Sequence, residues 1–483
     1  MWENIKAFII RRLIGMESYE LDLGRYDNII DVDKWTSIYE GNPSWVYDDE
    51  EASNVAASIV SSIAKKVTIE MESRIVDKDG EEDNEKAEFL DKQYQKLVDK
   101  TRVNVEHLLV QGGAVLRPYV TNGNIFTEFI LPNRFIPVRF DDNGDLVEVI
   151  FIDRLTKGNE TYTKLETHVL KDNGDYSIIH TFHLGDGITS DGKISKEISG
   201  KLVPAEWANA NFEKEFYGEG FKFPLFVYMR NPAANNKDIN SPLGVSIYSK
   251  VEGYLEAYDN IYNKYLWEFE GGELILVTSK DFVREMDPTF GNSGKGTFDG
   301  LPKRQRKKMK RLVATLDSKP QDLKEPITIF SPDLREESIN AGMEKILRDI
   351  EFGVGLGYGE LSRVDTTEKT AEEVRAGKQR THTTLVDIQK EIKRVYTRVI
   401  EIMEIYLDLG EGYHKLVSDE VIDDEVEVTW AFDDSIVVDR KSMLEAMLED
   451  VKLGIIPKET YIMEKYGVSE EEARRMAMNN SSE

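Results

Sequence analysis

The sequence predicts an α+β fold in which antiparallel β-hairpins lie between long helices. Three Asn-Gly pairs separate strand-like runs between residues 115 and 184, and this pair favours the tight turn of a β-hairpin. Apolar residues recur at helical spacing over residues 242–270 and again over residues 370–409. With 483 residues, the chain is long enough for several domains.

The composition excludes several classes of protein. The chain has no cysteine, so disulfides, cysteine-zinc sites and thiol nucleophiles are excluded. Its net charge is −28, from 62 basic and 90 acidic residues, whereas a protein that wraps nucleic acid is normally basic. This charge disfavours ordinary DNA binding but does not count against a protein that lets DNA slide past without adhering. No apolar run is long enough to span a bilayer, so we expect no membrane segment.

Helices are expected in the first third of the chain. Apolar residues stand at helical spacing at Val55, Ile59, Val60 and Ile63. The charged run Asp77–Glu88 carries its glycine at the fourth position, whereas the calcium loop of an EF-hand needs glycine at the sixth. We therefore interpret this run as a solvated turn before the next helix.

A sheet of antiparallel hairpins is expected next. Its turns should lie at the pairs Asn122-Gly123, Asn143-Gly144 and Asn173-Gly174. His180 and His183 are three residues apart in an expected strand, so their side chains face opposite sides and cannot share a metal ion. We therefore predict no metal site there.

Pro242 is expected to open a long helix that ends at Gly271-Gly272. Its apolar stripe is formed by Ile247, Val251, Leu255, Tyr258, Ile261, Tyr262, Tyr265 and Phe269. The helix carries five tyrosines, which are Tyr248, Tyr254, Tyr258, Tyr262 and Tyr265. We expect about half of them to pack in the core and the rest to make contacts between subunits.

A strand in residues 272–282 and a glycine-rich loop then precede a strongly basic run. Its seven basic residues are Lys303, Arg304, Arg306, Lys307, Lys308, Lys310 and Arg311. In so acidic a chain this run is anomalous. Three interpretations stay open, namely a solvated helix face, a contact with nucleic acid and a docking site for an acidic partner.

A second helix is expected to begin near Ser331, and four alternate glycines follow it at Gly353, Gly355, Gly357 and Gly359. The spacing and the preceding helix do not fit a dinucleotide-binding fingerprint. A phosphate-binding loop needs Gly-Lys-Ser/Thr, but Glu360 and Leu361 stand there instead. No catalytic constellation stands out elsewhere, so we expect neither an enzyme nor a cofactor. The remaining interpretation is mechanical, with the glycines as hinges of a mobile polar loop.

The last part of the chain should begin with a helix over residues 370–409. Thr370 and Glu373 form a capping box, and Gly377 suggests a bend or a close contact. The apolar stripe consists of Leu385, Ile388, Ile392, Val395, Val399, Ile402, Met403 and Tyr406. A strand over residues 425–432 and two short helices should follow, the second of them from a capping box at Ser469.

These patterns, in this order, resemble the portal protein of tailed bacteriophages, of the long-tailed siphovirus type. The resemblance covers most of the chain. Its motifs are "YEGNPSW" (Tyr39–Trp45), "PLGVSIYSKVEGYLEAYDNIYNKY" (Pro242–Tyr265), "FSPDLREESINAGMEKILRDIEFGVGLGYG" (Phe330–Gly359), "EKTAEEVRAGKQRTHTTLVDIQKEI" (Glu368–Ile392) and a tail over residues 433–473.

The resemblance implies a portal-like fold and a ring, usually of twelve subunits, at one vertex of the capsid. Double-stranded DNA would pass through its central channel during packaging and ejection. The implied domains are a wing with the β-hairpins (1–241), a stem helix (242–270), an α/β clip (271–330), a second stem helix (331–352), a tunnel loop (353–369), a long helix with a returning wing strand (370–432) and a helical crown (433–483).

The resemblance also implies functional residues. The tunnel loop would line the channel with Gly353, Gly355, Gly357, Tyr358, Gly359, Glu360, Leu361, Arg363 and Asp365. Arg363 could contact DNA, pair with the next subunit or form an ordinary surface ion pair. The basic run from Lys303 to Arg311 falls in the clip and could contact DNA or a partner.

The implied partners are further copies of the chain, DNA, the terminase large subunit, head-completion or adaptor proteins, and the scaffold and major capsid proteins. The protein would lie in the virion, and in the host cytoplasm during assembly. Two alternatives stay open. One is another capsid-associated connector or minor capsid protein without a closed channel, and the other is an enzyme with a mobile active-site loop.

Overall fold

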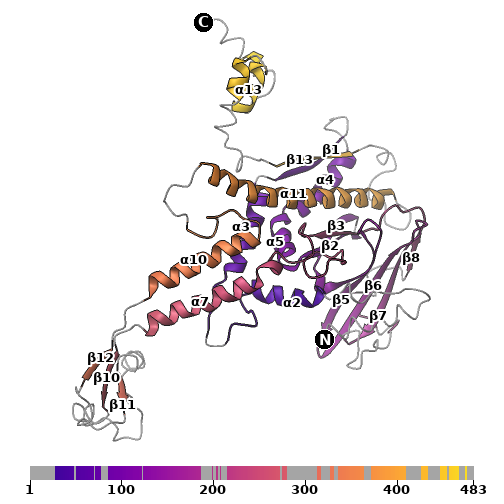
Figure 1. The fold of residues 1–483 in the computed structure, drawn as a ribbon. Helices are drawn as coiled ribbons and strands as arrows, with labels where there is room; N and C mark the ends of the chain where they lie inside the picture. The colour runs from indigo at the N-terminus through magenta and orange to yellow at the C-terminus, as the bar shows by residue number, and fades with distance from the viewer. Residues whose placement is uncertain are drawn as a thin grey trace.

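The computed structural model describes most of the chain. The described residues are 28–47, 50–69, 71–77, 85–121, 123–185, 198–199, 203–204, 207, 215–271, 275–279, 313–316, 327–330, 335–363, 371–408, 426–432, 447–453, 456–466 and 474–475. Figure 1 shows a body of helices and sheets, a pair of helices that projects from it, and a small sheet at the far end of that pair. This mixture of helix and antiparallel sheet agrees with the expected α+β class.

Five helices form most of the body. They are α2 (Asn28–Tyr39), α3 (Val55–Thr68), α4 (Glu85–Val98), α5 (Thr101–Gln111) and α11 (Ala371–Asp408). All eight residues of the apolar stripe expected in α11 are buried, and so are Ile59, Val60 and Ile63 of α3. One large hydrophobic core joins these helices with the base of the projecting pair. No described helix is both long and apolar enough to cross a bilayer.

Two antiparallel sheets pack beside the helices. One has the order β3-β2-β9, with β2 (Gly113–Thr121), β3 (Asn124–Ile130) and β9 (Val227–Arg230). The other has the order β4-β5-β6-β7-β8, with β4 (Phe135–Phe140), β5 (Leu146–Lys157), β6 (Glu160–Leu170), β7 (Tyr176–Leu184) and β8 (Glu215–Gly218). The chain forms both sheets mainly from consecutive hairpins.

The three expected hairpin turns are confirmed. Gly123, Gly144 and Gly174 have φ angles of 71°, 81° and 88° and join β2 to β3, β4 to β5 and β6 to β7. Each glycine adopts a left-handed backbone conformation that other residues rarely reach. A fourth hairpin joins β5 to β6 through Gly158, with φ 62°.

The projecting pair consists of α7 (Glu252–Gly271) and α10 (Glu336–Gly353). Figure 1 shows the two helices side by side, leading out to a three-stranded sheet of β10 (Ile275–Ser279), β11 (Val313–Leu316) and β12 (Ile327–Phe330). In this sheet β10 is central, parallel to β11 and antiparallel to β12. The strand expected in residues 272–282 is therefore confirmed as β10.

The expectation that Pro242 opens the first long helix was wrong. The chain forms the short 3-10 helix η4 (Ile247–Lys250) first, and α7 begins at Glu252. The segment before η4 is held by other contacts. The Asn231 side chain donates to the Val245 carbonyl at 2.8 Å, and a side chain at Gly244 would lie 2.0 Å from the Gly112 carbonyl oxygen. This close packing of two backbone segments is not visible in helical periodicity.

A two-stranded sheet lies against α4 and α11. It pairs β13 (Val426–Ala431), which the sequence predicts, with β1 (Glu72–Asp77), which it does not. In the tail, helix α13 (Lys458–Tyr466) is described, and residues 447–452 are also helical. The expected capping residues Thr370 and Ser469 and the expected helix start at Ser331 lie outside the described residues.

Candidate functional site

The candidate site is the segment that follows α10 and precedes α11. Its first part, Gly353–Arg363, is described and is called the glycine strip below. Asp365 and the rest of the expected loop to Lys369 lie outside the described residues. So does the whole basic run from Lys303 to Arg311. The structure therefore places eight of the nine residues expected in the loop, and none of the basic run.

The glycines of the strip meet local geometric requirements. Gly355 and Gly359 have φ angles of 80° and 95°, in the left-handed region. Gly353 lies so close to Val251 that a Cβ atom would be 2.3 Å from the valine Cγ1. Turn geometry and close packing thus account for three of the four glycines without a hinge.

Glu351, in the last turn of α10, holds the strip from inside. Its side chain is fully buried. Its carboxylate accepts hydrogen bonds from the backbone N–H groups of Leu361 at 2.5 Å and Ser362 at 2.8 Å, and from Gly359 at 3.2 Å. The Ser362 hydroxyl donates to the second oxygen at 2.9 Å. The sequence analysis missed Glu351, because it looks like one more acid in an acidic helix.

Helix α11 holds the strip from the other side. Gly357 N–H donates to the Thr381 hydroxyl at 2.9 Å, and the Thr384 hydroxyl donates to the Gly355 carbonyl at 2.8 Å. Between these contacts, Leu356 is buried in the core. The strip is therefore hydrogen-bonded to both of the helices that it joins.

Three polar or aromatic residues of the strip face outward. Glu360 forms an ion pair with Lys66 of α3. Tyr358 is 56% exposed, and the Arg363 side chain is 89% exposed. Arg363 lies 4.0 Å from Glu344, which is a weak surface pair. Tyr358 and Arg363 are the described side chains of the strip best placed to meet something outside the subunit.

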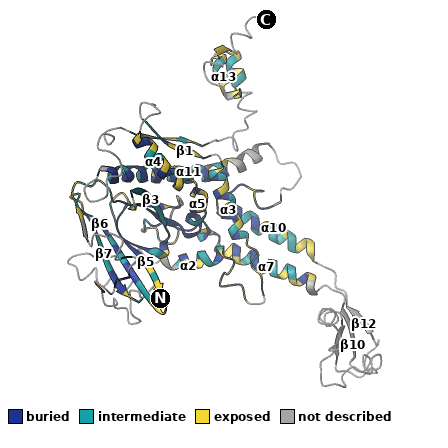
Figure 2. Cartoon of the chain, turned by 180° about the vertical axis from the view of Figure 1, so that it is seen from behind, coloured by how far each residue is buried: buried dark blue, intermediate teal, exposed yellow. Residues whose placement is uncertain are grey.

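The side chains of the helix pair become more exposed with distance from the body. In the expected apolar stripe, the residues nearest the body are buried, namely Ile247 of η4, Val251 after it, and Leu255 and Tyr258 of α7. Further out, Trp267 is 66% exposed and Phe269 is 40% exposed. Figure 2 shows a similar change along α10, from buried residues near the body to exposed residues at its outer end. Tyr248 and Tyr258 are buried whereas Tyr254 is exposed, as expected for a helix that only partly belongs to the core.

A strap formed by residues 43–47 and 50–53 contacts α7 and ties it to the body. Trp45 Nε1 and the Ser53 hydroxyl donate to the Asp259 carboxylate at 2.9 and 2.6 Å. One turn further out, the Asn263 side chain exchanges two hydrogen bonds with the backbone of Glu51, each 2.9 Å long. The motif that ends at Trp45 therefore has a structural role, because it fixes the helix pair to the N-terminal part.

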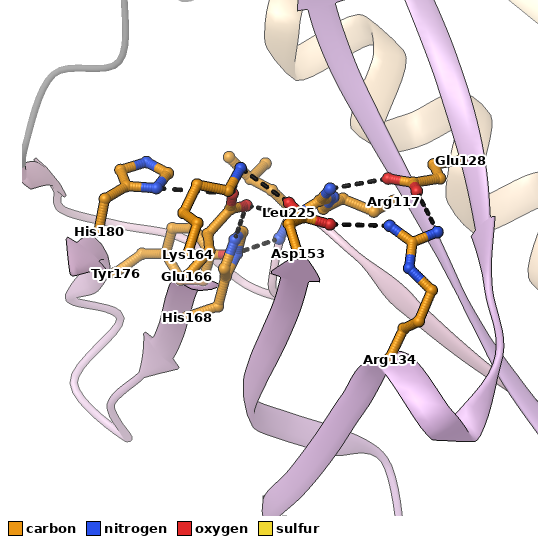
Figure 3. A network of polar contacts seen from close by, with 10 residues as sticks. All are labelled: Arg117, Glu128, Arg134, Asp153, Lys164, Glu166, His168, Tyr176, His180 and Leu225. Carbon is orange, nitrogen blue, oxygen red and sulfur yellow. Dashed lines mark hydrogen bonds and ion pairs between the residues drawn. The ribbon is translucent and has the colours of Figure 1, made fainter. Parts of the chain in front are cut away.

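A buried ion cluster joins the β3-β2-β9 sheet to the five-stranded sheet (Figure 3). Glu166 of β6 accepts a hydrogen bond from Arg117 of β2 at 2.7 Å, and His168 Nε2 lies 2.8 Å from the same carboxylate. Lys164 lies 3.4 Å from Glu166 and 2.8 Å from Asp153 of β5. The cluster thus ties β2 to β5 and β6, which belong to different sheets.

The outer edge of the ion cluster is more open to solvent. Arg117 also pairs with Glu128 of β3 at 2.7 Å. Arg134 bridges Glu128 and Asp153 at 2.8 and 2.7 Å. Three cations therefore face three carboxylates, so the cluster is neutral when its histidines are neutral.

The histidines of the ion cluster are held neutral. Burial lowers the pKa of His168 and lowers the pKa of His180 to about 4, although the nearby Glu166 carboxylate opposes both shifts. Burial also opposes ionisation of Glu166, but Arg117, His168 and Lys164 outweigh it and hold the pKa of Glu166 well below its ordinary value. His168 Nδ1 lies 2.5 Å from the Tyr176 hydroxyl.

The Tyr176, His168 and Glu166 chain has the order of an acid–base relay, but its surroundings indicate a structural role. All three side chains are buried, and the Tyr176 hydroxyl also accepts the Leu225 N–H at 3.1 Å. A relay needs a substrate within hydrogen-bond reach. The described residues also hold no group of three or more histidine and acidic side chains fit for a metal ion.

Two helices thus project from an α+β body, with a small sheet at their tip and an anchored strip at their base. A comparison with known families identifies the class of protein. The family model "Phage portal protein, SPP1 Gp6-like" matches residues 24–483, and the chain belongs to this family. The expected resemblance is therefore confirmed, and with it the assignment to a structural, capsid-associated family. No curated protein sequence matches the chain.

Proposed function

We propose that the chain assembles into a closed ring, of about twelve subunits, at one vertex of the capsid, and that double-stranded DNA is packaged and ejected through the ring. The observation that carries the proposal is the exposed apolar surface of the helix pair, at Tyr254, Trp267, Phe269 and Phe352. Large apolar surfaces rimmed by polar residues mark interfaces. Neighbouring copies of the helix pair would cover this surface.

In this proposal the helix pair is the stem, and the sheet at its tip is part of the clip. The residues before α7 are the wing, α11 crosses back over it, and the tail forms the crown. Ring closure needs two different patches on each subunit, because rotation about one axis brings unlike faces together. Exposed aromatic side chains lie at both ends of the pair, with Trp267 near the outer end of α7 and Phe352 near the body end of α10.

The glycine strip would border the channel through Tyr358 and Arg363, which face away from their own subunit. Residues 364–369 would complete the tunnel loop. Passing DNA carries about one negative charge per 1.7 Å of duplex axis. A chain with net charge −28 would repel it on average, and a single exposed arginine per subunit would meet phosphates without gripping them.

The basic run from Lys303 to Arg311 would serve the clip. It would contact DNA at the channel mouth or dock the acidic surface of the terminase large subunit or an adaptor protein. Replacing its seven basic residues by glutamine should lower packaging or adaptor binding and leave ring assembly intact. Unchanged packaging together with unchanged adaptor affinity would rule out this role.

Electron microscopy of the purified full-length chain tests the ring. Class averages should show end-on rings with a central hole wide enough for duplex DNA, and their symmetry gives the subunit number. Trp267→Glu should abolish the rings, because a charge would be buried in the interface. Ile239→Glu is the matched control, since Ile239 is 92% exposed on a loop of the body. Rings that persist in Trp267→Glu would show that the outer part of α7 is not the interface.

Small particles that persist at high concentration and beside co-expressed scaffold and major capsid proteins would contradict the ring. A connector without a closed channel would then be the better description.

A further inference from the structure

The stability of helix α10 does not explain why a glutamate occupies position 351. It lies in the last turn of α10, where the helix dipole disfavours a negative charge. It is also fully buried, and a buried carboxylate is costly unless it is paired or hydrogen-bonded. The ion pairs between described residues include none with Glu351. Its compensation comes from the N–H groups of the strip.

The dependence is mutual. Gly359, Leu361 and Ser362 would leave their N–H groups without these acceptors if the carboxylate moved away. The carboxylate would in turn lose its donors if the strip opened. A carboxylate that accepts several N–H groups forms strong, charge-assisted bonds. The strip and the end of α10 should therefore move together or not at all.

The strip is also attached elsewhere. Thr381 and Thr384 bind it to α11, and Glu360 binds it to Lys66 of α3. Arg363 N–H donates to Glu344 of α10 at 2.8 Å. Four separate attachments along eleven residues, Gly353–Arg363, leave little freedom for the glycines.

We infer that Glu351 is a positioning residue that makes the glycine strip a fixed link between α10, α11 and α3, instead of a hinge. A force on the exposed Tyr358 or Arg363 is then passed to the helix pair and the body. The inference rests on the proposed function only for the source of that force, which would be the passing DNA. The fixed link itself does not depend on ring formation.

Amide hydrogen exchange of the full-length chain tests the link. In the unaltered protein the N–H groups of Leu361 and Ser362 should exchange at least about tenfold more slowly than unprotected amides, because they are bonded and shielded. Glu351→Ala should remove this protection while the amides of α11 keep theirs. Exchange at the unprotected rate in the unaltered protein would overturn the inference and restore the hinge.

Two further variants separate a lost link from general unfolding. Glu351→Gln keeps one acceptor oxygen, so exchange should speed up at Gly359 first, with Leu361 and Ser362 partly protected. Asp349→Asn is the matched control, because Asp349 lies in the same turn but pairs outward with Lys345 at 2.6 Å. In Asp349→Asn, the protection of the strip amides from hydrogen exchange should be unchanged. Equal effects of Asp349→Asn and Glu351→Gln would contradict a specific role for Glu351.

The same samples also report on the ring. Rings of normal symmetry in Glu351→Gln with altered exchange would support both the ring and the link. Absence of rings in the unaltered protein, even at high concentration and beside co-expressed scaffold and major capsid proteins, would contradict the proposed function and leave the exchange result to decide the link alone.

Discussion

Glu166 and Glu351 are both buried carboxylates, but the protein compensates them in different ways. Glu166 faces the cations Arg117 and Lys164, which come from another sheet and from its own strand. Glu351 faces backbone N–H groups of a segment that begins two residues later. The first joins parts of the chain far apart in sequence, and the second fixes a local turn.

The difference teaches what each arrangement can tolerate. A buried ion cluster is stable only while its charges balance, because each uncompensated ion keeps its full desolvation cost. Backbone N–H groups carry only partial charges, and water can replace their acceptor near the surface. The ion cluster should therefore be the more brittle of the two, and the strip the more forgiving.

The largest expected loss of stability follows when the buried glutamate at each site is replaced by glutamine and the two variants are compared. Glu166→Gln leaves Arg117 and Lys164 with one carboxylate too few, and it should lower the free energy of unfolding by about 3–5 kcal/mol. Glu351→Gln keeps one acceptor oxygen and should cost about 1–2 kcal/mol. Urea unfolding of the two variants under the same conditions measures both values.

Glu128→Gln is the control within the ion cluster. Glu128 pairs with Arg117 and Arg134, but its side chain is 26% exposed, so water can solvate what it leaves behind. We expect Glu128→Gln to lower the free energy of unfolding by about 1 kcal/mol. Equal losses for Glu128→Gln, Glu166→Gln and Glu351→Gln would refute the contrast between the sites.

The second largest expected effect is a loss of folding stability at acidic pH, through the histidines of the ion cluster. The folded-state pKa of His180 is about 4, below the ordinary value of 6.5, so the unfolded chain binds the extra proton first. Stability is then full above pH 6.5 and falls as the pH drops toward 4, by at most about 3 kcal/mol. The charged and titratable groups around His180 are Glu166, Lys164, His168 and Arg117.

Unfolding free energies at pH 7 and pH 5 test this expectation. His180→Gln should show a smaller loss on acidification than the unaltered protein, because it lacks one titrating ring. The comparison also cancels the change in overall charge, which both proteins share. The same pH dependence in both would mean that His180 does not carry the effect.

The elements that the sequence predicted well share one property, which is a strong local signal. The Asn-Gly turns at Gly123, Gly144 and Gly174 need only their own backbone geometry. The stripe of α11 is regular over eight residues, and all are buried. The predicted start of the first long helix at Pro242 was wrong because the neighbouring Gly244 packs against Gly112, more than a hundred residues earlier in the chain.

The site shows the same limit. The sequence located the glycine strip, but it could not reveal that Glu351 would turn inward onto the strip. In a chain with 90 acidic residues one more glutamate carries no signal. The strand β1 was missed for a related reason, because its partner β13 lies about 350 residues away and its own residues are mostly polar.

The smallest expected loss of stability comes from replacing a glycine by alanine. The comparison is between a glycine that the backbone of the strip requires and a glycine in α7 where a side chain has room. Gly355 has φ 80°, and a Cβ atom there would lie 2.5 Å from the Thr384 hydroxyl oxygen. Gly355→Ala should therefore cost about 1–2 kcal/mol in urea unfolding. Gly253, in the first turn of α7, has no atom within 4 Å of an added Cβ, so Gly253→Ala should leave stability unchanged or slightly higher. If Gly355→Ala were as harmless as Gly253→Ala, the strip would have to adapt its backbone freely, as a hinge does and a fixed link does not.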